Sequence, residues 1–337
     1  MVTIYDIAKK ANVSAMTVSR VINNTGRISE KTRKKVKLVM EELHYVPNQT
    51  ARSLVLQQTH LIFLLITDIT NPFFTTLSRG AEDAARKYGY KVLFGNSDED
   101  LEKEKDYIQT ILASRVDGVL ITPTGDSSLT HLEMLQQHQV PFILLDREVP
   151  GIVCDIVVGD SRESGLTLTE HLIAKGHRHI AMINGSSTIS SARHRLQGYR
   201  DALKLGDIPV VEDWILESGF GSNNQLDHIA AWLDSLPSPV TAIIAGNNVL
   251  AVQMITLLRQ RGKRVPDDIS VVCFDDLGPY SSVDPFMTVI SQQAYQFGYL
   301  GMQTLIERIQ DKETDQPWRK LVLPSELIER KSVLELE

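Results

Sequence analysis

Polar and aromatic side chains follow several apolar, strand-like runs of this sequence. The motif N-P-F-F begins at Asn71, shortly after one such run, and Asp146 and Arg147 follow directly on another. Carboxylates, arginines and amides form paired hydrogen bonds to vicinal hydroxyls, and aromatic rings cover the C–H faces of a sugar ring. The mixture predicts a binding site for a neutral polyhydroxylated ligand. Its candidate residues are Asn71, Phe73, Phe74, Asp146, Arg147, Arg195, Phe220, Asn247, Asp275 and Gln292.

Each of these residues also has a purely structural interpretation. Asn71 can cap the helix that follows it, because Asn-Pro after a strand is a turn signal. Phe73 or Phe74 can belong to a hydrophobic core, and Asp146 and Arg147 can form an ion pair. Their joint placement after strands is what favours a binding site.

The sequence lacks the motifs that would indicate catalysis. It contains no G-x-G-x-x-G, no P-loop motif and no H-E-x-x-H, and its nine histidines are scattered without metal-ligand spacing. Asp275 and Asp276 are adjacent acids, but neither has partners for general acid–base work. We therefore expect no enzyme activity, no metal and no cofactor.

An alternation of strands and helices must position the candidate residues. Amphipathic helices, such as residues 74–88 and 101–114, separate the apolar runs. This alternation predicts two α/β lobes with doubly wound parallel sheets and a cleft at the carboxyl ends of the strands. The runs expected to form strands are residues 61–67, 90–95, 116–122, 140–146, 155–160, 179–185, 240–246 and 269–275.

The N-terminal residues Thr3–Asn23 have a different pattern, typical of two short helices and a tight turn. Thr3 and Asp6 have capping-box spacing, and Ser14 is a good N-cap for the second helix. This pattern is typical of a helix-turn-helix that reads the DNA major groove, although an ordinary helical hairpin fits it equally well. The residues left on the outer side of the second helix are Ala15, Met16, Thr17, Ser19 and Arg20.

The distribution of charge favours the DNA-binding interpretation. The net charge of -7 divides into +6 for residues 1–59 and -13 for the rest of the chain. A basic head on an acidic body is expected when only the head meets phosphate. A third helix, predicted from Ser29 to about Leu43, carries Lys31, Arg33, Lys34, Lys35 and Lys37, some of which are expected to contact phosphates.

The run from Asp6 to Asn23, DIAKKANVSAMTVSRVIN, closely resembles the N-terminus of the lactose/galactose-repressor (LacI/GalR) family of bacterial transcription regulators. The resemblance covers essentially the whole chain, and Asn12 stands where many members carry Gly. It implies a helix-turn-helix head and a hinge helix that orders when two protomers pair on the operator. Ala51-Arg52-Ser53-Leu54 matches the hinge, and Leu54 takes the role of a minor-groove wedge. The implied DNA-binding residues are Thr3, Ser14, Ala15, Met16, Thr17, Ser19, Arg20, Asn23, Arg27, Ala51 and Leu54.

The family body is similar to periplasmic sugar-binding proteins, and the ten candidate positions resemble their ribose-type set. The resemblance therefore implies ribose or a close pentose as the effector. Asn248 stands where many relatives have Asp, and Ile189 stands near an Arg of the purine-binding branch, which disfavours a purine corepressor.

These observations predict the following division of the chain. Residues 1–46 form the DNA-binding domain, 47–59 the hinge helix and linker, and 60–337 the effector-binding and dimerisation domain. The N-terminal lobe is expected at about 60–159 and 290–320, and the C-terminal lobe at about 160–289 and 321–332.

The expected function is repression of sugar-utilisation genes by a cytoplasmic homodimer on a pseudo-palindromic operator. The N-terminus has no signal-peptide run, no apolar stretch is long enough to span a membrane, and Cys154 and Cys273 are expected to be reduced. No heptad segment follows the body, which favours a dimer over a tetramer. Two alternatives remain: a global catabolite-type regulator with a phosphoprotein corepressor, and a free sugar-binding protein of a transport system.

Overall fold

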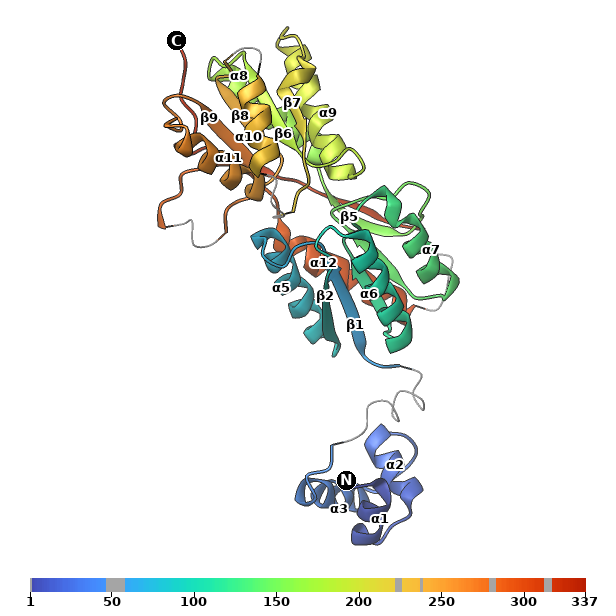
Figure 1. Cartoon of the computed structure of the whole chain (residues 1–337). Coiled ribbons are helices and arrows are strands. Elements are labelled where there is room, and N and C mark those ends of the chain that lie inside the picture. The colour runs from blue at the N-terminus through green and yellow to red at the C-terminus, as the bar shows by residue number, and fades with distance from the viewer. Residues whose placement is uncertain (1, 47–57, 222–225, 237–238, 279–282, 312–316) are drawn as a thin grey trace. The chain divides into compact units, whose positions relative to one another are not determined.

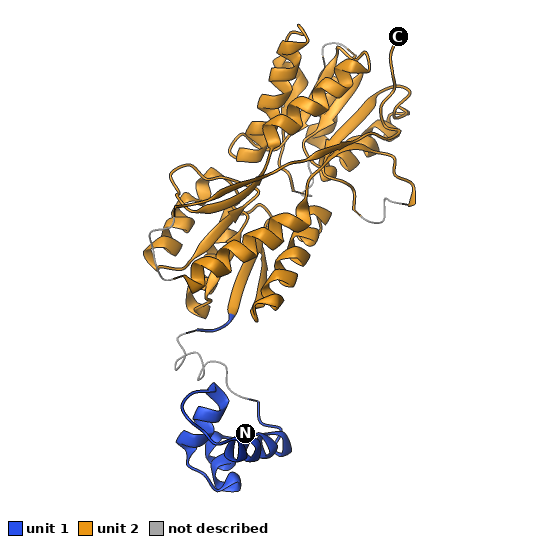
Figure 2. Cartoon of the chain, turned by 180° about the vertical axis from the view of Figure 1, so that it is seen from behind, with its two compact units in different colours: residues 1–60 blue, residues 61–337 orange. Residues whose placement is uncertain are grey.

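The computed structural model describes residues 2–46, 58–221, 226–236, 239–278, 283–311 and 317–337. The chain forms two compact units, residues 1–60 and 61–337, which are described separately (Figure 2). The predicted hinge helix, with Ala51 and Leu54, lies almost entirely outside the described residues.

Unit 1 is a three-helix domain of α1 (Ile4–Ala11), α2 (Ala15–Asn23) and α3 (Glu30–Glu42). Thr3 and Asp6 form the predicted capping box, and Ser14 accepts a hydrogen bond from the backbone N–H of Thr17. Asn12 ends α1 with a left-handed φ of 50°, a conformation that Asn tolerates. The predicted helix-turn-helix is confirmed. Its core consists of Ile7, Ala8, Ala11, Val18, Val21, Val36 and Val39.

Unit 2 contains two six-stranded sheets whose strands follow corresponding orders, β11-β5-β4-β3-β1-β2 in the first and β12-β10-β9-β8-β6-β7 in the second. All pairs are parallel except β10 with β12, so the predicted α/β fold class is confirmed. The strands of the first sheet are β1 (Leu61–Ile66), β2 (Lys91–Asn96), β3 (Gly118–Ile121), β4 (Phe142–Leu145), β5 (Asp155–Gly159) and β11 (Lys320–Leu323). Those of the second are β6 (Ile180–Asn184), β7 (Ile215–Glu217), β8 (Ala242–Ala245), β9 (Ser270–Phe274), β10 (Thr288–Ser291) and β12 (Glu326–Ile328).

Eight of these strands coincide with the predicted apolar runs, whereas β7, β10, β11 and β12 were not predicted. The sheets lie in separate lobes, and the helices cover them as layers (Figure 1). The helices are α5 (Pro72–Lys87), α6 (Leu101–Ser114), η1 (Asp126–Ser128), α7 (Leu129–Gln137), α8 (Ser161–Ala174), α9 (Ser190–Leu205), η2 (Glu212–Trp214), α10 (Leu226–Ser235), α11 (Asn248–Gln260) and α12 (Ala294–Gln310). None of the described helices has the length and apolarity needed to cross a membrane.

The chain passes between the lobes three times, after β5, β10 and β11. Two of these passages lie a few residues later than the sequence pattern indicated. β10 keeps residues up to Ser291 in the second sheet, and β11 places Lys320–Leu323 beside β5 in the first. The difference arises because strand pairing, which is long-range, decides the lobe to which these short segments belong.

Glycines allow α5 and α12 to pack closely against each other in the first lobe. A Cβ atom at Gly298 would collide with the carbonyl oxygen of Leu77, and one at Gly80 would collide with that of Tyr295. These obstacles are backbone atoms of the facing helix, so they cannot move aside as a flexible side chain would.

We therefore expect Gly298→Ala to force the two helices apart and to lower the free energy of unfolding by about 2 kcal/mol or more. Urea denaturation followed by circular dichroism measures this quantity. Gln296→Ala, at an exposed position of α12, is the control and should change it by less than about 0.5 kcal/mol. Equal stability of the two variants would contradict this account of the packing.

Candidate functional site

The outer side of α2 in unit 1 carries the predicted base-reading residues. Met16 has 63% of its surface exposed, Arg20 is exposed, and Ala15 is half-buried. The Arg20 stem lies near Gly26, where a Cβ atom would be 3.4 Å from Arg20 Cδ. Met16 can pack on thymine methyl groups, and Arg20 can make paired hydrogen bonds to guanine.

The remaining predicted DNA-binding residues of unit 1 differ in their exposure. Thr3, Ser14 and Arg27 are exposed, and Thr17 and Ser19 are half-buried. Asn23 is buried, and its Nδ2 donates to Ser19 Oγ at 3.3 Å. Ala51 and Leu54 lie outside the described residues.

Tyr5 is an exposed aromatic residue of unit 1 that the sequence pattern did not single out. Its side chain on α1 is 71% exposed. Its position out of phase with Ile4, Ile7 and Ala8, which form the inner side of α1, is a signal that could have identified it.

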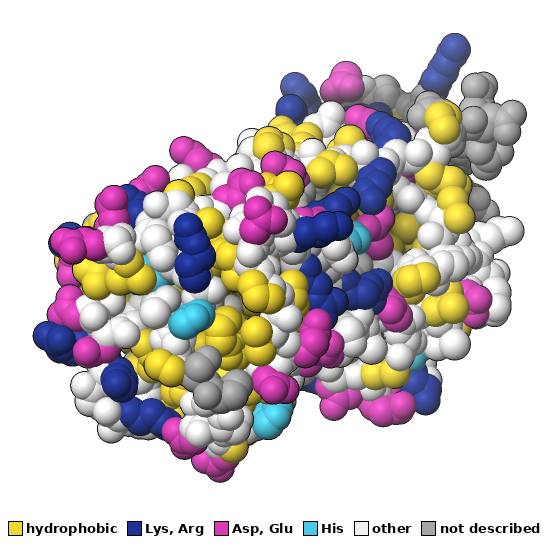
Figure 3. Space-filling view, turned by 90° about the horizontal axis from the view of Figure 1, so that it is seen from above, with side chains coloured by type: hydrophobic (Ala, Val, Ile, Leu, Met, Phe, Trp, Pro, Cys, Tyr) yellow, Lys and Arg dark blue, Asp and Glu magenta, His cyan; other side chains and the backbone are white. Residues whose placement is uncertain are grey.

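The basic residues of α3 are mostly open to solvent. Lys31, Lys34, Lys35 and Lys37 are exposed, whereas Arg33 hydrogen-bonds to Asn24 and lies 3.8 Å from Glu30. On the face of unit 2 in Figure 3, by contrast, acidic side chains are interspersed among the basic ones. The distribution agrees with a basic head, whose lysines can contact phosphates.

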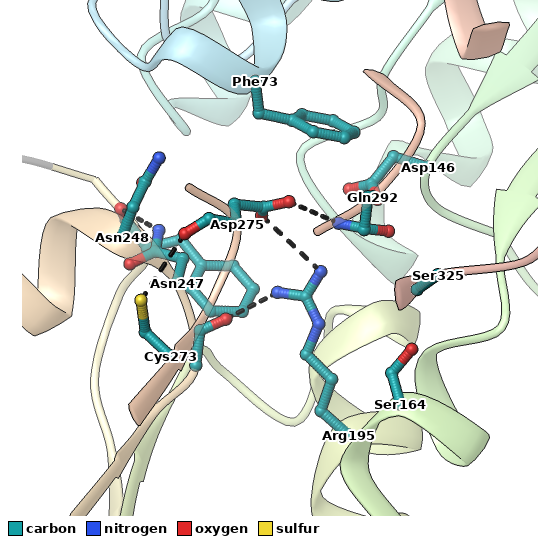
Figure 4. Close-up of polar contacts among 12 residues, drawn as sticks. Phe73, Asp146, Ser164, Arg195, Asn247, Asn248, Cys273, Asp275, Gln292 and Ser325 are labelled. Carbon is teal, nitrogen blue, oxygen red and sulfur yellow. Dashed lines mark hydrogen bonds and ion pairs between the residues drawn. The ribbon is translucent and has the colours of Figure 1, made fainter. Parts of the chain in front are cut away.

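In unit 2, nine of the ten residues predicted to bind the effector line one cavity between the lobes. The tenth, Gln292, donates from Nε2 to Asp275 Oδ1 at 2.8 Å, as Figure 4 shows. The cavity is small: the volume within which the centre of a water molecule can move is only about 20 Å³. That is room for about one water molecule. A sugar can therefore enter only when the lobes separate or side chains move. The nine residues are Asn71, Phe73, Phe74, Asp146, Arg147, Arg195, Phe220, Asn247 and Asp275.

Asp146 and Asp275 occupy equivalent positions in the two lobes. Asp146 follows β4 and Asp275 follows β9, and these strands hold the same place in their sheets. Both aspartates have a φ of 66°. This left-handed backbone is uncommon for a residue other than Gly, but Asp adopts it more readily than most.

Arg195 is held between a carboxylate and aromatic rings. Its Nη1 donates to the carbonyl oxygen of Gly246 at 2.5 Å, and its Nη2 lies 4.0 Å from Asp275 Oδ2 (Figure 4). The guanidinium carbon is 4.5 Å from the centre of the Phe274 ring and 5.7 Å from that of Phe220. Such contacts stabilise a desolvated guanidinium.

The asparagines of the cavity have structural roles as well. Asn71 Oδ1 caps α5 by accepting from the Phe73 N–H at 3.0 Å, and it also accepts from Asn248 Nδ2 of the other lobe at 3.1 Å. Asn247 caps α11 through Leu250 N and donates to the carbonyl oxygen of Phe220. The structural interpretation of Asn71 is therefore correct, and it is compatible with a binding role.

Arg147 pairs with a residue that the sequence reasoning missed. Glu99, in the loop after β2, accepts hydrogen bonds from Arg147 Nη1 at 2.8 Å and from Arg147 Nη2 at 2.7 Å. Asp68, two residues after β1, is a second cavity residue that was not predicted, and its Oδ2 has no hydrogen-bond partner among the described residues. Both follow strands of the first sheet, as the predicted residues do, and this position could have identified them.

Further contacts join the lobes outside the cavity. Asp126 of η1 and Arg193 of α9 form a two-point ion pair at 2.7 and 3.1 Å. Near it, the Asp126 N–H donates to the carbonyl oxygen of Thr188, and the Glu148 N–H donates to Ser190 Oγ. These contacts hold the two lobes together.

Burial raises the pKa of Asp275 to about 6, although the positive charge of Arg195 and the hydrogen bond from Gln292 act in the opposite direction. Asp146 and Asp276 raise the pKa further, because like charges disfavour ionisation. The Asp275 carboxylate is therefore costly to keep ionised inside the cavity.

The two cysteines are free, and their thiols are poor nucleophiles. Burial raises the pKa of Cys154 to about 12 and that of Cys273 well above its usual value. Among the described residues, no group of three or more His, Cys, Asp or Glu side chains could hold a metal ion.

Family comparisons cover nearly the whole chain. Residues 3–48 match "Bacterial regulatory proteins, lacI family", and residues 59–331 match "Periplasmic binding proteins and sugar binding domain of LacI family". The HTH-type transcriptional regulator DegA of Bacillus subtilis is 36% identical, over 98% of this chain and 97% of its own length. The HTH-type transcriptional repressor PurR of Photobacterium profundum is 34% identical over the full length of both chains.

Solved structures show the same architecture. A lac repressor dimer bound to operator and an anti-inducer has a TM-score of 0.82 and 29% identity, covering 99% of each chain. A LacI family transcriptional regulator from Enterococcus faecium with bound ribose has a TM-score of 0.71 and 29% identity, covering 82% of this chain and 100% of its own.

The raised pKa of Asp275 predicts a pH dependence of stability. Because the folded protein holds this proton more tightly than the unfolded chain, Asp275 makes stability fall as pH rises from about 4 through 6. Between pH 5 and 7.5, we expect the free energy of unfolding to fall by about 1 kcal/mol more in wild type than in Asp275→Asn. Urea titrations at both pH values measure this difference, and Asp106→Asn, at an exposed position of α6, should behave as wild type. Parallel pH profiles for wild type and Asp275→Asn would contradict the prediction.

Proposed function

The chain belongs to the lacI family of bacterial regulatory proteins and is a DNA-binding transcriptional repressor, and we propose that a pentose bound between the lobes of unit 2 controls its binding to operator DNA. On this proposal it represses sugar-utilisation genes as a cytoplasmic homodimer on a pseudo-palindromic operator. Family membership removes the alternative of a free sugar-binding protein of a transport system.

The observation that carries the proposal is the lining of the interlobe cavity. Phe73, Phe74 and Phe220 supply ring faces, while Asp146, Asp275 and Asn247 supply hydrogen-bonding groups around them. Aromatic faces and paired polar groups together match the alternating C–H and hydroxyl surfaces of a small sugar. The ribose-bound regulator from Enterococcus faecium, with a similar fold, supports this choice of ligand.

Family similarity alone does not select the effector, because relatives named PurR are nearly as similar to this chain as DegA is. A ligand screen must therefore include purine bases beside pentoses. The chemistry of the lining favours the pentose, since its polar groups come from both lobes and surround the rings.

The proposed mechanism is a shift between two conformations of the body. A sugar that binds one arrangement of the lobes more tightly favours that arrangement, and contacts such as Asp126–Arg193 are made or broken with it. If one arrangement binds operator more tightly, sugar and operator affect each other's affinity by the same factor. Residues 47–59 provide the connection through which this shift would reach unit 1.

In the proposed DNA complex, Arg20 supplies sequence discrimination. Replacing it with Ala should reduce the preference for the operator over non-specific DNA by about 1–3 kcal/mol, because paired hydrogen bonds to a guanine are lost. Gel shifts on an operator selected from randomised duplexes, compared with non-specific DNA, measure this ratio. Lys35→Ala, which removes an exposed charge of α3, should weaken both complexes equally. An unchanged ratio for Arg20→Ala would show that the discrimination lies elsewhere.

Phe220→Ala should abolish the response to the sugar. At 100 times its dissociation constant, the sugar that binds best among D-ribose and related pentoses should stabilise wild type by about 2.7 kcal/mol. The variant should show little of this stabilisation, whereas Phe94→Ala, a partly exposed position of β2, should keep it. Thermal unfolding with and without sugar provides the measurement. Stabilisation of wild type by a purine base and by none of the pentoses would overturn the proposed effector.

A further inference from the structure

Glu99 binds the Arg147 guanidinium by two hydrogen bonds in the lining of the cavity. The Arg147 side chain is only 2% exposed and the Glu99 side chain 16%, so water screens the pair poorly. Glu99 also adjoins the second lobe, because a Cβ atom at Gly221 would lie 3.7 Å from Glu99 Cγ. The pair therefore lies beside the space between the lobes that the proposed ligand would occupy.

The arginine has few donors left for a ligand. Its Nη1 also donates to the carbonyl oxygens of Pro123 and Thr124, and its Nη2 donates to Glu99. Its Nε, which has no hydrogen-bond partner among the described residues, lies 3.6 Å from Asp146 Oδ2. A ligand oxygen that approaches Arg147 thus meets a guanidinium whose positive charge is already balanced by the carboxylates of Glu99 and Asp146.

Acidic groups outnumber basic groups around this cavity. Two guanidiniums, those of Arg147 and Arg195, face four carboxyl groups, and Arg195 is itself adjacent to Asp275. An anion entering such a site meets like charges at short range in a poorly screened environment. The four carboxyl groups belong to Asp68, Glu99, Asp146 and Asp275.

We propose that Glu99 sets the charge selectivity of the cleft. By neutralising Arg147 it keeps the site open to uncharged sugars and closed to phosphorylated sugars and sugar acids, whose anionic groups would otherwise bind that guanidinium. The inference rests on the proposed effector site and assigns Glu99 the role of a specificity-determining residue.

Inorganic phosphate is a probe that tests this role without knowledge of the effector. Glu99→Gln keeps the size of the side chain and removes its charge, which leaves Arg147 available to an anion. The phosphate concentration that gives half-maximal thermal stabilisation should be about tenfold lower for Glu99→Gln than for wild type. Glu102→Gln, the same change at a side chain that is 81% exposed, should match wild type and accounts for phosphate bound elsewhere.

The gain should depend on Arg147. Adding Arg147→Gln to Glu99→Gln should return the phosphate requirement to that of wild type. Should Glu99→Gln fold poorly, Glu99→Ala provides the same test, because it also removes the carboxylate that neutralises Arg147. A phosphate requirement equal to that of wild type in a folded Glu99 variant, or a gain that survives loss of Arg147, would overturn the proposal.

A second comparison separates this inference from the proposed function. Wild type should bind D-ribose in preference to D-ribonate, its carboxylate counterpart, and Glu99→Gln should reduce that preference about tenfold. If wild type binds ribose and Glu99→Gln keeps the full preference, the role of Glu99 is wrong while the pentose site stands. If wild type binds neither compound and no related pentose, the pentose proposal fails, and the phosphate measurement still decides the role of Glu99.

Discussion

The buried guanidinium of Arg147 is the charge around which the first lobe's half of the cleft is built. A buried cation is tolerated only when carboxylates and carbonyl oxygens surround it. Glu99 supplies one side, and the carbonyl oxygens of Pro123 and Thr124 supply the other. The Thr124 backbone is in turn held by buried Glu104, which also accepts from Ser128 Oγ and pairs with His131 Nδ1. One buried charge thus orders three loops of the same sheet.

Residues of the cleft serve the fold and the site at the same time. Asn71 caps α5 and also receives a hydrogen bond from Asn248 in the opposite lobe. Asn247 caps α11 while it fixes the backbone of Phe220, whose ring faces Arg195. A group held by a helix terminus presents its remaining hydrogen-bonding capacity in a defined direction, which is the preorganisation that a small ligand needs.

The lobes are joined by contacts that a change in their arrangement would break. The Asp126–Arg193 ion pair and the Asn71–Asn248 hydrogen bond join residues of different lobes, so both depend on the arrangement of the lobes. A ligand bound between the lobes can shift the balance between two arrangements only through the difference in its affinity for them.

Local patterns in the sequence predicted the helix caps at Thr3 and Ser14 and eight of the strands, because capping and periodicity act over a few residues. They also predicted nine residues that line one cavity, because parallel strands bring their carboxyl ends to one edge of a sheet. The tertiary structure alone decided the pairing of Glu99 with Arg147, 48 residues away. It also decided the lobe to which β10 and β11 belong and the burial of Asn23. Ion pairs, strand pairing and burial depend on partners that are distant in the chain, and no local pattern specifies them.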